Sequence, residues 1–218
     1  MIYHLDKHKI WFPKPYLAEE DGLLAIGGDL SAERLLLAYN NGIFPWYSDE
    51  TPILWYSPHE RFVLFPEEIR ISTSMKQLMK NGKFHITFNK AFSEVISNCS
   101  SSSRKDGPGT WITDEMKDAY INLHKLGIAY SVEVWENSEL IGGLYGVEID
   151  LTFCGESMFS KVSNASKLAL IALCRSKKYN MIDCQLHTPH LESMGGKMIN
   201  RQHYLEILHP QKFSSPNA

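Results

Sequence analysis

The chain has 218 residues, of which 44% are hydrophobic and 22% are charged, and its formal net charge is -3 at pH 7. This is the composition of an ordinary globular protein, long enough for one large or two modest domains. The slightly negative charge excludes a general electrostatic attraction to nucleic acid, so any RNA contact requires a local basic patch.

Cysteine usage and hydropathy predict a soluble cytoplasmic protein without membrane contact. The cysteines are Cys99, Cys154, Cys174 and Cys184, and none has the C-x-x-C spacing of a metal or redox site. Most of them lie in apolar segments, where a free thiol behaves as a small hydrophobic group and suits a reducing compartment. The N-terminus lacks the apolar run of a signal peptide, and no stretch reaches the ~18 apolar residues of a membrane helix.

Residues 1–60 are predicted to form a small domain rich in aromatic residues, glycine and proline. Residues 21–29 are glycine-rich and predict a loop, but the loop lacks the preceding strand and the Lys-Ser/Thr of a phosphate-binding loop. Ser31 predicts the N-cap of a helix over 32–39. Residues 42–61 are dense in aromatic side chains, which form either a small core or a stacking surface, and their number favours a core.

Residues 61–218 are predicted to form a second domain of mixed strands and helices. We expect strands over 62–65, 85–88, 129–135, 140–149, 151–155 and 181–185, and helices over 73–80, over 91–98, after Thr113 and after Asn164. Residues 100–109 read as a mobile loop of Ser, Gly, Pro and Lys. The fold class is therefore α+β, with a β-β-β-α-β order in its second half.

The junction at residues 153–167 is predicted to hold the chemistry. An apolar strand runs there into a polar turn, from Glu156 to Ser160, and then into a buried helix capped by Ser163 or Asn164. Such a turn opens onto a site with exposed donors. From this stretch alone, Glu156 is either a site residue or a solvated turn residue.

Asp183 and Gln185 are two apart on a predicted strand, so both side chains are expected on one face. A carboxylate and an amide at a strand end can hold and polarise a nucleophile. The alternative is an Asp that caps a turn and a Gln that faces solvent.

Other candidate sites are weaker. His187 and His190 have a spacing that a metal could use, but no further ligands complete a set nearby, so we read them as structural or surface residues and expect no metal. Lys76, Lys80 and Lys83 form a modest basic cluster, which is either a solvated face or a phosphate contact.

Six motifs in order resemble those of the leucyl/phenylalanyl-tRNA–protein transferases. They are GLLAIGGDL (22–30), GIFPW (42–46), GTWI (109–112), SVEVW (131–135), GESMFS (155–160) followed by NASKLAL (164–170), and IDCQ (182–185). The resemblance covers roughly residues 12–204 and is more specific than a lone glycine-rich pattern. It implies an N-acetyltransferase-like (GNAT-like) second domain over 61–218, with a mixed, largely antiparallel sheet flanked by helices.

The resemblance implies transfer of Leu or Phe, and less readily Met, from aminoacyl-tRNA to the N-terminal Arg or Lys of a protein, which marks that protein for N-end rule degradation. Conversion of an ester to an amide is downhill, so no cofactor is expected. Asp183 and Gln185 match the catalytic residues, and Glu156 is our first choice to bind the acceptor's cationic side chain. The residues that match the aminoacyl slot and its surroundings are Tyr39, Trp46, Trp111, Tyr120, Phe153, Gly155, Met158 and Leu170.

Within this resemblance the terminal adenine of the tRNA stacks on Trp46 or Trp111, and Lys76, Lys80 and Lys83 contact its phosphates. Tyr56 and Gly196 depart from the family pattern, and the lysine helix is less basic than usual, which bears on tRNA affinity more than on activity. Two other functions stay open on the residues alone. They are an acetyl-coenzyme-A-dependent N-acyltransferase and a noncatalytic RNA- or peptide-binding module.

Overall fold

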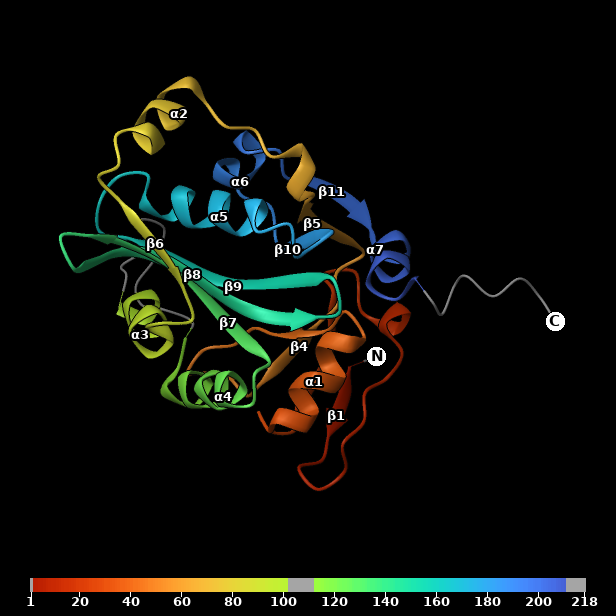
Figure 1. Ribbon diagram of the computed structural model, residues 1–218. Coiled ribbons are helices and arrows are strands. Elements are labelled where there is room, and N and C mark those ends of the chain that lie inside the picture. Colours follow the sequence, from red (N-terminus) through yellow and green to blue (C-terminus); the bar gives the residue numbers. More distant parts are fainter. Residues whose placement is uncertain (1, 102–111, 211–218) are drawn as a thin grey trace.

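The computed structural model describes residues 2–101 and 112–210 (Figure 1). A four-stranded sheet of order β1-β2-β4-β3 contains β1 (Tyr3–Leu5), β2 (Leu23–Gly27), β3 (Phe44–Pro45) and β4 (Leu54–Tyr56). A seven-stranded sheet of order β11-β5-β10-β9-β8-β7-β6 contains β5 (Glu60–Leu64), β6 (His85–Phe88), β7 (Ala129–Glu136), β8 (Glu139–Ile149), β9 (Thr152–Ser160), β10 (Met181–Gln185) and β11 (Lys197–Asn200).

The helices flank both faces of the larger sheet. They are α1 (Ala32–Asn40), α2 (Thr73–Lys80), α3 (Phe92–Ser101), α4 (Asp114–Lys125), α5 (Ala165–Arg175), α6 (Pro189–Ser193) and α7 (Arg201–Leu208), with short 3-10 helices η1 (Pro15–Leu17) and η2 (Pro66–Glu68). In Figure 1, α2, α5 and α6 lie on one side of the sheet, and α1, α3 and α4 lie on the other. Each side has its own cluster of buried apolar residues.

The larger sheet confirms the predicted α+β class with a mixed, largely antiparallel sheet. β9 and β10 pair in parallel, whereas the other neighbouring strands pair antiparallel. A parallel pair needs a crossover connection, and α5 provides it between β9 and β10. The predicted order of three strands, a helix and a strand is observed as β7-β8-β9-α5-β10.

Side chains cap the N-termini of α1, α2, α4, α6 and α7. Ser31 Oγ accepts from the amide of Arg34 at 3.4 Å, and Thr113 Oγ1 accepts from the amide of Met116 at 3.1 Å, so both predicted N-caps are confirmed. Ser72 does the same for α2. Within the described residues, no helix has the length and apolarity that crossing a bilayer requires.

Two loop predictions were wrong because strand pairing overrides local composition. Residues 23–27, predicted as part of a glycine-rich loop, form β2, which pairs with both β1 and β4. The predicted polar turn from Glu156 to Ser160 is instead the second half of β9. That half continues because the long strand β8 pairs with it as far as Ser160.

The predicted cap of α5 is confirmed in position, because Asn164 is the N-cap residue, but it makes no side-chain cap. Asn164 has a left-handed backbone (φ 72°), which Asn tolerates better than most residues, and its side chain accepts no capping hydrogen bond. Ser160 Oγ instead accepts from the amide of Ser166 at 2.8 Å. The end of β9 therefore supplies the hydroxyl that the sequence pattern assigned to the residues just before the helix.

The aromatic N-terminal segment forms a core, as its residue density predicted, with Trp46 as an exception. Trp55 is fully buried and its Nε1 donates to the carbonyl oxygen of Gly27 at 2.8 Å. Phe44 is buried, whereas Trp46 is 43% exposed. This core is continuous with the apolar cluster under the larger sheet. The division at residues 60 and 61 stays a prediction.

Candidate functional site

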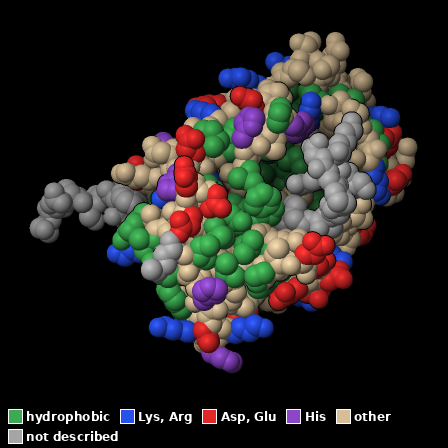
Figure 2. All heavy atoms as spheres, turned by 180° about the vertical axis from the view of Figure 1, so that it is seen from behind, with side chains coloured by type: hydrophobic (Ala, Val, Ile, Leu, Met, Phe, Trp, Pro, Cys, Tyr) green, Lys and Arg blue, Asp and Glu red, His purple; other side chains and the backbone are tan. Residues whose placement is uncertain are grey.

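A cavity of about 350 Å³ opens between the loop that carries Trp46 and the ends of β9 and β10. Most of its wall is apolar, and Figure 2 shows a recess lined by hydrophobic side chains on one face of the molecule. The lining residues are Phe44, Pro45, Trp46, Leu144, Tyr145, Phe153, Gly155, Glu156, Ser157, Met158, Leu170, Leu173, Ile182, Cys184, Gln185, Leu186, Thr188, His190 and Leu191. The volume falls within the range of small-molecule binding sites, about 300–1,000 Å³.

Glu156 and Gln185 both lie where the regular ladder of the sheet is interrupted. β8 pairs with Ser157 and then directly with Gly155, which leaves Glu156 as an extra residue in β9. β5 pairs with Asp183 and then directly with Gln185, whose φ is 62°. A bulge redirects side chains locally. Two bulges in neighbouring strands thus bring Glu156 and Gln185 together, with Gln185 Nε2 donating to Glu156 Oε1 at 2.8 Å.

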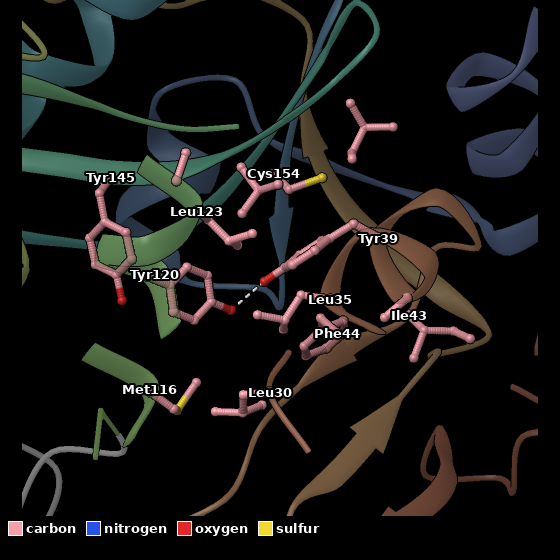
Figure 3. Packing of buried hydrophobic residues seen from close by; sticks show 14 of the residues in the cluster. Leu30, Leu35, Tyr39, Ile43, Phe44, Met116, Tyr120, Leu123, Tyr145 and Cys154 are labelled. Atoms are coloured by element: carbon pink, nitrogen blue, oxygen red, sulfur yellow. Dashed lines mark hydrogen bonds between the residues drawn. The ribbon is translucent and has the colours of Figure 1, made fainter. Parts of the chain in front are cut away.

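The carboxylate of Glu156 is 6% exposed, and its hydrogen-bond donors among the described residues are all neutral. The hydroxyl of Tyr39 donates to Oε1 at 2.7 Å, and that of Tyr120 donates to Oε2 at 3.0 Å. The two hydroxyls also contact each other, and Figure 3 shows Tyr39 of α1 and Tyr120 of α4 pointing toward one another in the core. Three donors fill three of the roughly four acceptor positions of a carboxylate.

Proton counting and burial both favour protonation of Glu156. The two tyrosine hydroxyls and the carboxyl group make three mutual hydrogen bonds, but an ionised carboxylate leaves only two protons for them. A protonated Glu156 supplies the third proton. Burial raises the pKa of Glu156 to about 7, against the opposing effect of its hydrogen-bond donors. At neutral pH the group therefore lies near the midpoint of its titration.

Asp183 lies deeper and is fully satisfied by donors from the protein. Arg61 donates from Nε to Oδ1 at 2.8 Å and from Nη2 to Oδ2 at 2.7 Å. The amide of Gln185 donates to Oδ1 at 2.8 Å, and the hydroxyl of Tyr204 donates to Oδ2 at 2.9 Å. All of about four acceptor positions are filled, and Asp183 is absent from the cavity wall.

The expectation that Asp183 and Gln185 share one face stays a prediction, but it assumed a regular strand, and the pairing of β10 with β5 is interrupted between the two residues. The bulge after Asp183 separates their surroundings: the Asp183 carboxylate meets Arg61, and the Gln185 amide meets Glu156 in the cavity wall. Sequence reasoning also missed Arg61. An arginine next to the apolar run 62–65 was the available signal, since a charge at the start of a buried strand needs an internal partner.

The structure divides the predicted substrate-binding residues into two groups. Those that line the cavity are Trp46, Phe153, Gly155, Glu156, Met158 and Leu170. Tyr39 and Tyr120 are buried behind Glu156 and do not line the cavity; they support its carboxyl group instead. Trp111 and most of the predicted loop over 100–109 lie outside the described residues.

The predicted basic cluster is exposed at and beyond α2. Lys76 and Lys80 lie on the helix, and Lys83 follows it and pairs with Glu136 at 2.7 Å. Within the described ranges, no group of three or more His, Cys, Asp or Glu side chains is arranged to hold a metal ion.

His190 has a place that its sequence context did not predict. It was read as structural or surface, yet it belongs to the cavity wall. Its Nε2 is buried and has no hydrogen-bond partner among the described residues. Burial lowers the pKa of its imidazole, with Lys167 acting in the same direction.

Two family models match the chain, one before residue 60 and one from residue 63 onward. The model described as "Leucyl/phenylalanyl-tRNA protein transferase N-terminal domain" matches residues 28–59, and "Leucyl/phenylalanyl-tRNA protein transferase" matches residues 63–209. Together they cover most of the chain.

The chain belongs to the leucyl/phenylalanyl-tRNA protein transferase family.

Curated relatives agree with this membership along nearly the whole length. Family members from Flavobacterium psychrophilum and Flavobacterium johnsoniae are each 52% identical; the matches cover 94% and 95% of this chain and 99% of each relative. A family member from Syntrophobacter fumaroxidans is also 52% identical, over 95% of this chain and 89% of the relative. Among solved structures, L-PGS from Bacillus licheniformis is similar over 76% of this chain and 53% of that chain, with 11% identity and a TM-score of 0.40.

Proposed function

We propose that the chain transfers Leu or Phe, and less readily Met, from aminoacyl-tRNA to the N-terminal Arg or Lys of acceptor proteins, and that Glu156 selects those acceptors. Family membership supports the aminoacyl transfer. The observation that carries the acceptor assignment is a buried carboxylate, at the wall of an apolar cavity, whose described partners are all neutral.

The acceptor's cationic side chain takes the remaining acceptor position of Glu156. Three neutral donors hold the carboxylate in place without cancelling its charge. A guanidinium or ammonium group that enters the cavity forms a charge-assisted hydrogen bond, and low local dielectric strengthens it. Binding the cation replaces the proton that burial favours on Glu156. An acidic or uncharged acceptor residue offers no such exchange.

The aminoacyl group of the donor occupies the apolar part of the cavity. Phe153, Met158 and Leu170 belong to this wall, and its volume of about 350 Å³ accepts a Leu or Phe side chain. Trp46 lies at the same cavity with 43% of its surface exposed, so its ring is available to stack on the terminal adenine. Stacking of one base on an aromatic side chain contributes ~1–3 kcal/mol.

Gln185 holds the attacking amine, and Asp183 holds Gln185. The amide N–H of the Gln185 side chain donates to Glu156, and no described residue donates to its Oε1. That oxygen accepts from the acceptor's α-amine, which attacks the ester carbon. The C–N bond forms, the C–O bond to the ribose breaks, and the amine proton passes to the departing ribose oxygen. Asp183 acts through the main chain of Gln185, because its own oxygens are already filled.

The remaining features of the proposal follow from the donor and acceptor. Lys76, Lys80 and Lys83 are exposed and supply local positive charge for tRNA phosphates on a chain without net positive charge. We assign the larger sheet and its helices to an N-acetyltransferase-like fold and the activity to the cytoplasm, where tagged proteins enter N-end rule degradation. No cofactor takes part, since the aminoacyl ester is itself activated.

An acceptor panel tests the proposal. The purified protein is mixed with labelled Leu-tRNA and peptides that begin with Arg, Lys, Asp or Gly, without ATP or acetyl coenzyme A. We expect label on the Arg and Lys peptides and at least tenfold less on the others. Equal transfer to all four peptides would remove the acidic acceptor site, and binding of Leu-tRNA without any transfer would favour a noncatalytic module.

Comparing Glu156→Gln with a matched surface variant tests whether Glu156 selects the acceptor peptide. Glu156→Gln keeps the shape but removes the charge, so kcat/KM for the Arg peptide should fall about 10–100-fold, equivalent to the ~1.5–3 kcal/mol of a hydrogen bond to a charged group. Affinity for Leu-tRNA should stay within twofold. Glu139→Gln is the control, because its side chain is 69% exposed and pairs only loosely with Lys161 at 3.9 Å.

A further inference from the structure

Arg61 is a buried cation that touches two walls of the cavity without lining it. It is 2% exposed and forms the paired hydrogen bonds to Asp183 described above. Its Nη1 also donates to the carbonyl oxygen of Gly42 at 3.3 Å. The guanidinium lies 4.5 Å from the ring centre of Phe44 and 4.7 Å from that of Tyr204.

On one side, these contacts hold the segment that carries Trp46. Gly42 has a left-handed backbone (φ 67°), and a Cβ there would lie 2.9 Å from the Tyr204 ring, so the chain can approach Arg61 closely only with glycine. Phe44, two residues before Trp46, packs its ring against the guanidinium. The carbonyl of Gly42 and the ring of Phe44 thus fix the start of the loop through Arg61.

On the other side, the same guanidinium fixes the part of the cavity wall that carries Gln185. It fixes the carboxylate of Asp183, and that carboxylate accepts from the main-chain amide of Gln185 at 2.8 Å. Gln185 has a left-handed backbone in the bulge, a conformation that a non-glycine residue keeps only when its surroundings hold it. Burial acts to lower the pKa of Arg61, but its neighbours together, with Asp183 first among them, outweigh burial and raise it, so the guanidinium stays charged.

We propose that Arg61 is a positioning residue that sets the separation between Trp46 and Gln185, and hence between the donor's adenine and the attacking amine. The roles of Trp46 and Gln185 in this inference rest on the proposed function. The coupling between them through Arg61 consists of contacts within the protein that need no substrate. Lysine cannot replace arginine here. The planar guanidinium donates two hydrogen bonds to one carboxylate and a third to the carbonyl of Gly42, and it packs against aromatic rings. A lysine ammonium is a compact point charge that cannot make all of these contacts.

A purely stabilising ion pair is the competing explanation, and a double variant separates the two. Removing one partner of a buried pair leaves the other charge unpaired, whereas replacing both with apolar residues of similar size often restores stability. Arg61→Met combined with Asp183→Leu should therefore regain much of the free energy of unfolding that Arg61→Met loses. We expect its kcat/KM to stay at least tenfold below the wild type, with the KM for Leu-tRNA raised and kcat lowered.

Arg34→Met is the matched control. Arg34 is also fully buried, and its Nη2 donates to the carbonyl oxygens of Asp6 and Lys9, but it makes no contact with the cavity wall. Its loss should reduce stability while kcat/KM, measured below the unfolding temperature, stays within twofold of the wild type. Arg61→Lys is assayed alongside, because it keeps the charge and provides a folded sample if the apolar variants do not fold.

Hydrogen exchange gives a readout that does not depend on transfer. In Arg61→Lys we expect amide exchange at least tenfold faster in both 42–46 and 183–186, and unchanged exchange in those segments in Arg34→Met. Wild-type activity within twofold in the double variant or in Arg61→Lys, or faster exchange in only one of the two segments, overturns the coupling. An inactive wild type refutes the proposed function instead, and the exchange result still decides the role of Arg61.

Discussion

Glu156 and Asp183 are two buried carboxylates on adjacent strands, and their surroundings differ in one respect. Both are almost inaccessible, at 6% and 0% exposure. Gln185 touches both, through its side chain to Glu156 and through its main chain to Asp183. Asp183 faces a cation of the protein itself, whereas Glu156 faces two tyrosines and an amide.

We propose that this difference separates a structural carboxylate from one available to a ligand. Asp183 is charged, paired and filled with donors, so it can only hold its neighbours in place. Glu156 keeps an open acceptor position, and burial raises its pKa although three neutral hydrogen-bond donors act in the opposite direction. A buried charge that lacks an internal partner costs stability, and a protein retains it where a ligand supplies the partner.

The largest expected effect comes from Asp183. Asp183→Ala should reduce the free energy of unfolding by about 3–5 kcal/mol, because Arg61 is left buried and unpaired. Urea unfolding at pH 7 measures the loss. Glu156→Ala serves as the comparison and should cost less, since it leaves no charge behind. A loss below about 1 kcal/mol for Asp183→Ala would mean that the pair is not the fixed element we describe.

The next effect is the pH dependence of stability. The pKa of Glu156 is raised from its ordinary 4.5 to about 7, so ionisation in the folded chain costs about 3 kcal/mol more than in the unfolded chain. The stability that the protonated group contributes is complete below pH 4.5 and is lost as pH rises to about 7. Glu156→Gln should therefore become more stable than the wild type as pH rises from 5 to 8.

Urea unfolding across this range checks the prediction, with Glu139→Gln as the control that should follow the wild type. Parallel stability curves for the wild type and Glu156→Gln would show that Glu156 titrates normally and that burial does not perturb it.

A third prediction concerns the pH dependence of transfer. With an Arg peptide, two groups that the reaction needs unprotonated take up protons as pH falls. They are the Glu156 carboxylate, whose pKa is about 7, and the acceptor's α-amine, whose pKa is about 7.7–8.0. The slope of log kcat/KM against pH should approach about 2 below pH 7 in the wild type and about 1 in Glu156→Gln. Equal slopes in the two proteins would place the acceptor's cationic side chain elsewhere.

The smallest expected effect lies in the apolar wall. Met158→Ala should reduce kcat/KM for Leu-tRNA about 3–10-fold and change that for Phe-tRNA less, because the larger ring still reaches the remaining walls. In the unmodified protein, Ile-tRNA should be used about 10–200-fold less well than Leu-tRNA, since branching at Cβ crowds the α-carbon. Competition between matched aminoacyl-tRNAs measures both ratios, and equal use of Ile and Leu would mean that Met158 lines a different part of the site.

The sequence by itself determined the family, the fold class and most of the helices. Capping residues and apolar periodicity are local signals, so Ser31 and Thr113 marked the start of α1 and α4 correctly. The family motifs GESMFS (155–160) and IDCQ (182–185) pointed to Glu156 and Gln185, which meet in the cavity wall.

Tertiary structure alone decided how those residues meet. The bulges at Glu156 and between Asp183 and Gln185 arise from pairing with β8 and β5, and a local sequence pattern does not show that pairing. The partner of Asp183 is Arg61, 122 positions earlier in the chain, and Tyr39 reaches Glu156 across 117 positions. Whether a buried carboxylate meets a cation or a neutral hydroxyl depends on such distant contacts, because burial and hydrogen bonding are properties of the folded chain.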